Sequence, residues 1–322
     1  MKKRRLSQTQ QRNIRQRHAE LAQREGLREG VIVSHHGKQL LIEDLETGQR
    51  LRGYPRQTLG ALTTGDRIRW VENKLGEASV EVLLPRQSLL VRPDSHGKAR
   101  LMAANLDQVL IVVAPLPTMN PFVIDQAIVA TLDLPARPLI VLNKSDLLYE
   151  VPANQLFTEL AEWRKVGFDS LQVSAKTGEG LDKLHEALKD HTSLLVGMSG
   201  VGKSSLTRQL SPQAADIAIA EISDHSQEGR HTTRTSTLYH LPAGGMLIDA
   251  PGVRDFGIYQ LNRQTIERGF PEIQEHASDC RFANCSHQHE PGCAVRRAVE
   301  NGTISARRFE SYSRLMAQLA GS

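Results

Sequence analysis

Short alternating hydrophobic runs in the first third of the chain predict β-strands. Turns that contain Gly37, Gly48 and Gly65 separate these runs. The expected strands span residues 31–34, 39–43, 49–52, 66–71 and 78–84. Five short strands within about 55 residues predict a small barrel, either an OB-fold, which often binds RNA, or an SH3-like barrel or other small β module. Residues 85–104 lack this pattern and are expected to form a linker.

From residue 105 onward, apolar runs alternate with amphipathic segments. The expected buried strands lie at residues 108–114, 138–142, 170–174, 193–197 and 246–249. Between two of these strands, Leu181, Leu184 and Leu188 share one face of a helix. This alternation predicts a parallel sheet covered on both sides, with nucleotide-binding loops at the carboxyl ends of its strands. A last helix is expected at about residues 305–319.

The charge of the chain is unevenly distributed. The 322 residues carry a net charge of +4, and 39% are hydrophobic and 24% charged, which is typical of a soluble globular protein. Residues 1–20 hold seven Lys or Arg against one Glu, a net +6 in this segment alone. We expect residues 1–30 to form a basic flexible tail that suits a polyanion such as RNA. The alternative is a solvated tail with no specific partner.

Neither membrane insertion nor secretion is indicated by the sequence. The longest apolar run, residues 109–114, is far too short to span a bilayer. The basic N-terminal segment lacks the apolar core of a secretory signal. A cytoplasmic protein without a membrane partner is therefore the expectation.

The strongest chemical signal follows the expected strand 193–197. Residues 197–204 have the pattern G-x-x-x-x-G-K-S between a strand and a helix, which predicts a phosphate-binding loop. Its backbone N–H groups turn toward a phosphate, and the following helix adds its positive dipole end. Lys203 is expected to reach the β- and γ-phosphates, and Ser204 is expected to bind Mg²⁺. The expected phosphate-binding residues are Gly197, Ser199, Gly200, Val201, Gly202, Lys203, Ser204 and Ser205.

A second motif selects the base. Asn143, Lys144 and Asp146 form N-K-x-D directly after the strand 138–142. The Asp146 carboxylate can accept hydrogen bonds from N1–H and the exocyclic amine of guanine, a pair of donors that adenine lacks. Asn143 is expected to contact the other edge of the base and to brace the phosphate loop. The aliphatic stem of Lys144 is expected to cover the ring face.

Two further strand ends complete the predicted nucleotide site. Ser174, Ala175 and Lys176 end the strand 170–174, and the Ala175 N–H is expected to recognise the guanine O6. Asp249 and Gly252 form D-x-x-G at the end of the strand 246–249. Asp249 is expected to reach Mg²⁺ through water, and the Gly252 N–H is expected to point at the γ-phosphate.

The segment 229–234, between the phosphate loop and D-x-x-G, is expected to supply a second Mg²⁺ ligand. Thr233 is the prediction and Thr232 the alternative, because the sequence does not separate them. Val253 stands where Ras-like enzymes place a water-orienting glutamine, so intrinsic hydrolysis is expected to be slow.

The order of the motifs is unusual, because N-K-x-D and S-A-K precede the phosphate loop. The same sheet forms if the conventional termini are joined and the chain is cut after the D-x-x-G strand. The expected architecture is multidomain: a tail, an OB-fold, a linker, a circularly permuted α/β P-loop GTPase domain and a zinc-binding helical domain. Their expected bounds are 1–30, 31–84, 85–104, 105–264 and 265–322.

The expected C-terminal domain contains all three cysteines of the chain. With one histidine they form the pattern C-x4-C-x-H-x5-C: Cys280, Cys285, His287 and Cys293. Three thiolates and an imidazole suit a closed, structural zinc site, and the lack of other cysteines argues against a disulfide framework. His276 and His289 are alternative fourth ligands, and redox-labile thiols are the alternative to a metal site.

Together these features resemble the RsgA (YjeQ/YloQ) family of bacterial, circularly permuted GTPases of small-ribosomal-subunit assembly. The resemblance covers almost the whole chain and includes NKSD, SAKTGEG, GMSGVGKSS, GRHTT, DAPG and the zinc pattern in that order. It implies a monomeric enzyme that hydrolyses GTP to GDP when stimulated by the small subunit and acts in late subunit maturation. It also implies that the OB and zinc domains contact ribosomal RNA.

The resemblance also implies a catalytic residue. His231 lies in the expected switch segment, where its imidazole could orient or deprotonate the attacking water. With Lys203 and Thr233 it forms the predicted catalytic set, although His231 has the alternative of supporting the loop or contacting RNA. Two other functions stay open: an RNA-binding assembly factor that uses GTP only as a binding switch, and a GTPase acting on transfer RNA or a membrane surface.

Overall fold

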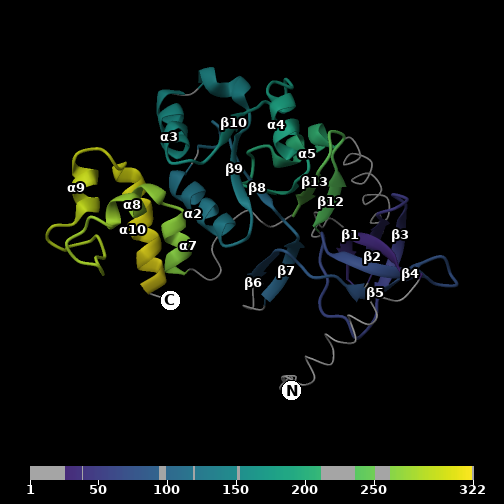
Figure 1. The fold of residues 1–322 in the computed structure, drawn as a ribbon. Coiled ribbons are helices and arrows are strands. Elements are labelled where there is room, and N and C mark those ends of the chain that lie inside the picture. The colour runs from purple at the N-terminus through teal and green to yellow at the C-terminus, as the bar shows by residue number, and fades with distance from the viewer. Residues whose placement is uncertain are drawn as a thin grey trace. The chain divides into compact units, whose positions relative to one another are not determined.

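The computed structural model describes residues 26–37, 39–93, 99–118, 120–150, 153–211, 236–250 and 262–320 (Figure 1). The chain divides into two compact units. The first comprises Met1–Asn105 with Thr235–Leu238, and the second comprises Leu106–Arg234 with Tyr239–Ser322. The C-terminal helices therefore belong to the same compact unit as the parallel sheet. None of the helices in the described ranges is both long and apolar enough to cross a bilayer.

The first unit contains the predicted five-stranded barrel. Its strands are β1 (Arg28–His36), β2 (Gln39–Asp44), β3 (Arg50–Pro55), β4 (Arg67–Glu72) and β5 (Ala78–Leu83). They pair in the order β1-β2-β3-β5-β4, and a β1–β4 pairing closes the barrel. Only β3 and β5 are parallel, which is the Greek-key arrangement of an OB-fold. The fully buried side chains of Ile32, Ile68 and Trp70 lie in its core.

The segment 85–104, expected as a linker, instead contains two paired strands. β6 (Leu89–Pro93) and β7 (Ala99–Ala104) form an antiparallel pair. Asn105 fastens this pair to the barrel: its Oδ1 accepts from the Gln87 N–H at 2.9 Å, and its Nδ2 donates to the Gly65 carbonyl at 2.8 Å. The prolines and polar residues of this segment obscured its strand pattern. Pairing between its two halves supplies the backbone hydrogen bonds that make them strands.

The second unit is built on the predicted parallel sheet. Its strands are β8 (Gln108–Val113), β9 (Arg137–Leu142), β10 (Ser170–Gln172), β11 (Thr192–Val196) and β13 (Met246–Asp249). They are parallel and ordered β10-β9-β8-β11-β13. All five expected strands are confirmed, with ends shifted by at most two residues. The hydrophobic pattern did not reveal the short strand β12 (Thr237–His240), which precedes β13. Thr237, at its start, belongs to the first unit and pairs there with Ser34 of β1.

Helices cover both faces of this sheet (Figure 1). The elements are α2 (Pro121–Leu132), the 3-10 helix η1 (Ser145–Glu150), α3 (Ala153–Lys165), α4 (Leu181–Leu188) and α5 (Lys203–Leu210). The buried leucines of α4 and α5 pack with Leu110 and Val112 of β8. Ile111 and Val113 point to the other face, toward α2, because successive residues of a strand alternate. The leucine face predicted for α4 is thus confirmed.

Four helices follow the sheet: α7 (Arg263–Arg268), α8 (Pro271–Ala277), α9 (Ala294–Glu300) and α10 (Ala306–Ala320). The boundary expected at residue 265 lies inside α7, and α10 matches the predicted last helix to within one residue. Ile266, Phe270 and Tyr312 form a core with Val129 of α2.

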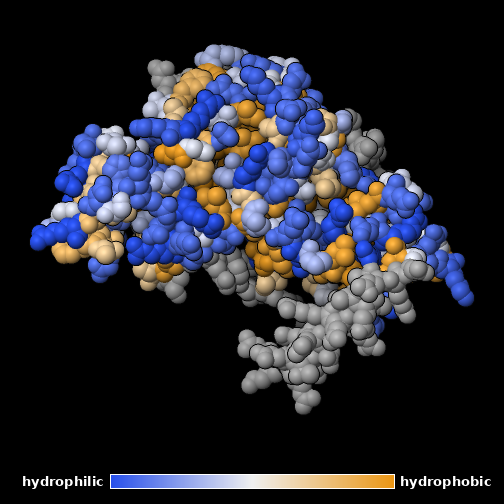
Figure 2. All heavy atoms as spheres, in the orientation of Figure 1, coloured by the Kyte–Doolittle hydropathy of each residue, from blue (hydrophilic) through white to orange (hydrophobic). Residues whose placement is uncertain are grey.

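Figure 2 shows that hydrophilic residues predominate on one face of the molecule, with hydrophobic residues scattered between them.

Candidate functional site

The phosphate loop joins β11 to α5 and depends on its glycines. Gly197 and Gly202 have φ angles of 141° and 91°, a region that side chains rarely adopt. A Cβ at Gly197 would collide with the carbonyl oxygen of Val112 on the neighbouring strand. A Cβ at Gly202 would collide with Nδ2 of Asn143. The loop therefore lies in direct contact with the carboxyl ends of β8 and β9.

The side chain of Lys203, the first residue of α5, reaches back to this loop. Its Nζ donates hydrogen bonds to the carbonyl oxygens of Gly197 and Met198, at 2.6 and 2.7 Å. Asp249 ends the neighbouring strand β13 and pairs in register with Leu195 of β11. Burial raises the pKa of the Asp249 carboxyl, and the nearby Lys203 ammonium opposes part of this rise. A cation and a carboxylate thus converge where the motifs predict a phosphate and Mg²⁺.

Asn143 connects the base-binding motif with the phosphate loop. It is 1% exposed, and its Nδ2 donates to the carbonyl oxygen of Val201 at 2.9 Å. Its Oδ1 accepts a hydrogen bond from the Ala175 N–H at 3.0 Å. One side chain therefore joins three of the predicted motifs. The Ala175 N–H, predicted to recognise guanine O6, is donated to Asn143 in this structure.

Asp146 and Lys144 lie at the same edge of the sheet. Oδ1 of Asp146, on η1, accepts from the Ser174 hydroxyl at 2.6 Å, and Lys176 Nζ lies 3.9 Å from Oδ2. Lys144 has a φ of 61°, and its Nζ donates to the carbonyl oxygen of Leu116 at 2.9 Å. N-K-x-D and S-A-K, 28 residues apart, thus meet around one carboxylate, as parallel strands require.

The remaining predicted residues divide into two groups. Ser204 and Ser205 are exposed on the first turn of α5. The predicted switch and D-x-x-G residues lie outside the described part of the chain: His231, Thr232, Thr233, Gly252 and Val253. Their roles stay predictions.

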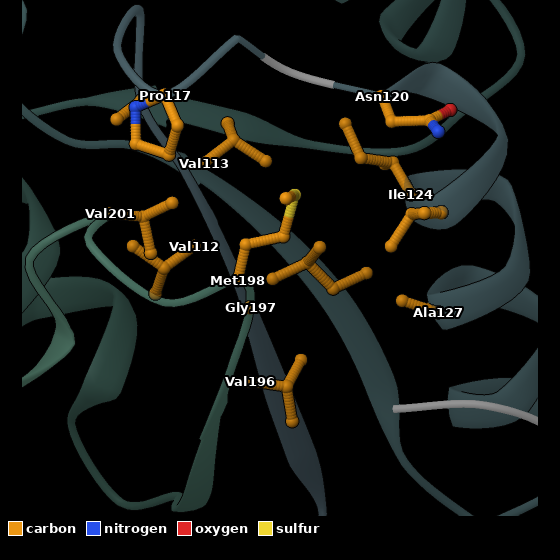
Figure 3. Close-up of a pocket in the computed structure, with 13 residues that line it drawn as sticks. Val112, Val113, Pro117, Asn120, Ile124, Ala127, Val196, Gly197, Met198 and Val201 are labelled. Carbon is orange, nitrogen blue, oxygen red and sulfur yellow. The ribbon is translucent and has the colours of Figure 1, made fainter. Parts of the chain in front are cut away.

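No sequence motif marks the loop between β8 and α2, which also contacts the nucleotide site. A Cβ at Gly200 of the phosphate loop would lie 3.6 Å from Cδ of Pro117, and the carbonyl of Leu116 accepts from Lys144. A pocket lined mostly by apolar side chains of β8, α2 and the phosphate loop adjoins it, and Met198 points into it (Figure 3). The only sequence signal was indirect: this loop follows a buried strand of a parallel sheet.

The four predicted metal ligands form a cluster in the C-terminal helices. Their ligand atoms, from Cys280, Cys285, His287 and Cys293, all lie within 4.8 Å of one another. The Sγ atoms of Cys280 and Cys293 are 3.8 Å apart, and His287 Nδ1 lies 3.6 and 3.5 Å from them. Tetrahedral zinc with ordinary bond lengths requires about 3.8 Å between sulfurs and about 3.6 Å between sulfur and nitrogen. The cluster therefore fits one zinc ion.

Backbone and side-chain contacts hold the ligands in place. Cys293 is the N-cap of α9, and its Sγ accepts from the Arg296 N–H at 3.4 Å. Burial alone would raise the pKa of the Cys280 thiol, but hydrogen bonds with the backbone of Val295 and Ala294 and with the thiols of Cys293 and Cys285 together outweigh it and lower the pKa. A lowered thiol pKa favours the thiolate, which is the form that binds a metal.

Glu290 closes the loop that carries His287. Its carboxylate accepts from the N–H groups of Ser286, Gln288 and His289, at 2.7, 3.2 and 3.1 Å. Hydrogen bonds from Ser286, together with other backbone N–H groups, lower the pKa of Glu290 well below its usual range. The two alternative ligands, His276 and His289, do not belong to the cluster. His276 bonds through Nδ1 with the carbonyl of Glu272, and His289 is exposed.

Comparison with known proteins decides the family. The model of the RsgA GTPase family matches residues 83–259. A "Small ribosomal subunit biogenesis GTPase RsgA" from Actinobacillus pleuropneumoniae is 43% identical over 98% of this chain and 95% of that protein. A protein of the same name from Ectopseudomonas mendocina is 42% identical over 90% of this chain and 85% of its own. The chain belongs to the RsgA GTPase family.

Solved structures of similar proteins share the fold of this chain. YjeQ from Thermotoga maritima is 32% identical, with a TM-score of 0.73 over 92% of this chain and 99% of that chain. YloQ, described as a circularly permuted GTPase, has a TM-score of 0.71 at 24% identity over 93% of this chain and 97% of its own, and supports the fold. As an RsgA-family protein, the chain is a GTP-hydrolysing enzyme whose expected cofactors are Mg²⁺ and one zinc ion.

Proposed function

We propose that this GTPase binds the small ribosomal subunit, acts in its late maturation and is stimulated by it to hydrolyse GTP. One observation carries the proposal: a permuted guanine-nucleotide site, an OB-type barrel and a Cys3His cluster occur together in one chain. That chain matches relatives named for small-subunit biogenesis along 90% or more of its length. The barrel and the zinc module are the proposed contacts with ribosomal RNA, and the proposed form is a cytoplasmic monomer.

In the proposed mechanism, Asp146 selects guanine, and Ser174 holds the carboxylate in place through its 2.6 Å hydrogen bond. Lys176 lies at the exposed edge of the base site, beside Asp146. Lys144 covers the base, and Asn143 fixes the phosphate loop relative to the base. Because a carboxylate that finds no donor on the base is costly to bury, ATP is expected to bind poorly.

The phosphate groups are held by the backbone N–H groups of the loop and by Lys203. Mg²⁺, when bound, neutralises charge on the phosphate oxygens. Ser204, Thr233 and, through water, Asp249 are the proposed residues around that ion. The hydrogen bonds of the Lys203 ammonium with the loop carbonyls of Gly197 and Met198 support its proposed role as the cation that contacts the β- and γ-phosphates.

We assign water activation to His231, because Val253 carries no hydrogen-bonding group. His231→Ala is expected to lose subunit-stimulated hydrolysis by roughly a hundredfold or more, within the range for a general base, while GTP affinity is retained. Full stimulated turnover by this variant at unchanged GTP affinity would exclude the catalytic role and leave His231 a support of its loop or an RNA contact.

The deciding experiment measures phosphate release from GTP and from ATP, with and without purified small ribosomal subunits. Strong stimulation for GTP alone is the expected result. Hydrolysis of GTP without stimulation would remove the subunit as activator, and equal use of ATP would overturn the roles of Asn143 and Asp146. Subunit binding that requires GTP, without turnover dependent on Lys203 and Ser204, would indicate an RNA-binding assembly factor with GTP as a switch.

A further inference from the structure

Helix α2 is shared between the nucleotide-binding sheet and the C-terminal helices. Its residues Ile124 and Ala127 line the pocket beside the phosphate loop (Figure 3). On another side of the helix, Val129 is fully buried against Ile266 and Phe270. A helix that is buried on opposite sides cannot move relative to one partner without disturbing its packing against the other.

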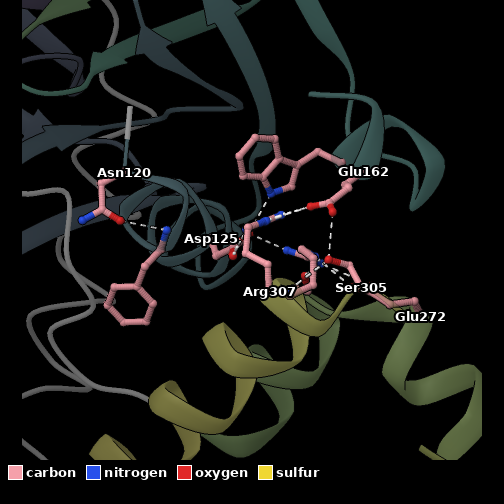
Figure 4. A network of polar contacts seen from close by, with 10 residues as sticks. Asn120, Asp125, Glu162, Glu272, Ser305 and Arg307 are labelled. Atoms are coloured by element: carbon pink, nitrogen blue, oxygen red, sulfur yellow. Dashed lines mark hydrogen bonds and ion pairs between the residues drawn. The ribbon is translucent and has the colours of Figure 1, made fainter. Parts of the chain in front are cut away.

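A buried carboxylate in the middle of α2 carries the main polar contact. Asp125 is fully buried, and its Oδ1 accepts from the indole N–H of Trp163 on α3 and from Nη1 of Arg308 on α10, both at 2.6 Å. Its Oδ2 accepts from Nη1 of Arg307 at 3.0 Å. Two successive residues of the last helix thus hold one carboxylate from the first helix of this unit (Figure 4).

The two arginines are themselves fixed by further partners. Arg308 is 1% exposed, donates to both carboxylate oxygens of Glu272 at 2.8 and 3.2 Å, and donates to the carbonyl of Gly269 at 2.7 Å. Nε of Arg307 donates to Glu162 at 2.7 Å, and the guanidinium lies 4.7 Å from the centre of the Trp163 ring. The network therefore defines one position of α10 against α2 and α3.

Two more contacts fasten α2 near its ends. The guanidinium of Arg314 on α10 stacks 3.9 Å above the ring of Phe122, in the first turn of α2. At the opposite end, Asp133 accepts from the hydroxyl of Thr265 at 3.1 Å and from Nδ2 of Asn262 at 3.3 Å. The C-terminal helices thus hold α2 near its start, in its middle and at its end.

The start of α2 reaches the nucleotide site directly. Asn120 caps the helix by accepting from the Phe122 N–H at 3.1 Å. A few residues earlier, Leu116 accepts the hydrogen bond of Lys144 from the base-binding motif, and Pro117 lies against Gly200 of the phosphate loop. The loop before α2 therefore contacts both the base side and the phosphate side of the site.

We propose that Asp125, Arg307 and Arg308 are positioning residues of the nucleotide site, acting through α2 and the loop before it. When the C-terminal helices are docked, this network holds the loop against Lys144 and the phosphate loop. Guanine-nucleotide affinity and docking of the C-terminal helices are then linked, so each strengthens the other by the same factor. The proposal concerns the chain alone and does not depend on its ribosomal partner.

Arg307→Met is the first test, because Arg307 is partly exposed and Asp125 keeps Arg308 and Trp163 as partners. The variant is expected to bind a fluorescent GDP analogue roughly tenfold more weakly than the parent chain, within the usual range of coupling between sites. Arg307→Lys, which keeps the cation, is expected to recover most of the affinity. Asp125→Asn is expected to weaken binding at least as much as Arg307→Met, but it carries a greater risk of misfolding.

Arg263→Met is the matched control, because Arg263 also forms an ion pair, but with Glu267 of its own helix α7. This variant is expected to bind nucleotide like the parent. The second readout is amide hydrogen exchange: GDP is expected to slow exchange in α10 of the parent but not of Arg307→Met. This readout separates coupling from a loss of overall stability, which would affect α10 with or without nucleotide.

Normal nucleotide affinity in folded Arg307→Met, or equal losses in Arg307→Met and Arg263→Met, would overturn the coupling. Amide hydrogen exchange in α10 of the parent that GDP does not slow would also overturn the coupling. A parent chain that binds no guanine nucleotide would overturn the proposed function as well, whereas a parent that binds normally but shows no coupling would overturn this inference alone.

Discussion

Nδ2 of Asn143 donates to the main-chain carbonyl of Val201, 58 residues further along the chain, across a distance of 2.9 Å. The same side chain accepts the Ala175 N–H. The Val201 carbonyl and the Ala175 N–H are both buried backbone groups that need a hydrogen-bond partner. The Asn143 side chain is that partner for both, so it keeps the phosphate loop and the S-A-K segment in register. One residue of the base motif thus joins two other segments of the nucleotide site.

Asn143→Ala should weaken GTP and GDP binding by roughly ten- to hundredfold. The substitution leaves buried backbone groups without partners, at a cost of about 1–3 kcal/mol. Titration calorimetry measures the effect. Asn105→Ala is the matched control, because Asn105 also joins a backbone N–H to a backbone carbonyl, but in the first unit. Equal nucleotide affinities of both variants would contradict the bracing role.

Gly202→Ala should abolish nucleotide binding, because the new Cβ would collide with Asn143 and the alanine would have to adopt a φ of 91°. Gly167→Ala separates these two effects: Gly167 has a φ of 93°, but no atom lies within 4 Å of the position that its Cβ would take. The control should lose about 1–2 kcal/mol of stability and keep its GTP affinity. Thermal unfolding and nucleotide titration, measured on both variants, test the distinction, and retained GTP binding by Gly202→Ala would refute it.

The purified chain should contain one zinc ion per molecule, and Cys285→Ser should lose it. Because structural zinc contributes folding free energy, removal by a strong chelator should also unfold α8 and α9, seen as a loss of helical circular dichroism. Atomic absorption gives the metal content. His276→Ala and His289→Ala should retain the metal, since neither side chain belongs to the cluster. Zinc loss in either histidine variant would show that the ligand set is wrong.

Glu290→Ala should lower zinc affinity without removing a ligand, because three N–H groups of the loop around His287 lose their acceptor. The pKa of Glu290 is lowered in the folded chain, so its stabilising effect is present above the usual carboxyl pKa of 4.5 and is lost as the pH falls through the depressed pKa. Competition with a chromophoric chelator at neutral pH measures the affinity. Glu300→Ala, exposed at the end of α9, serves as control, and equal affinities of the two variants would count against the loop-closing role.

Sequence patterns predicted the parts of the molecule that local chemistry determines. The leucines of α4 and the loop at Gly197 to Ser204 depend on neighbours within a few residues, so spacing alone predicted them. The strand β7 and the carbonyl of Leu116 depend on partners elsewhere in the chain. Arg308 and Asp125 are an extreme case, because their ion pair joins residues 183 positions apart and no local pattern announces it.

The contact between the first and last helices of the second unit has a consequence for the order of events during translation. Asp125 leaves the ribosome 183 residues before Arg308. At synthesis rates of about 5–20 residues per second, this delay lasts roughly 10–40 seconds. Throughout that time the nascent chain holds a carboxylate whose arginine partners have not yet been made. The strands of the sheet are all synthesised before α10, but α2 reaches its final environment only when α10 has been synthesised.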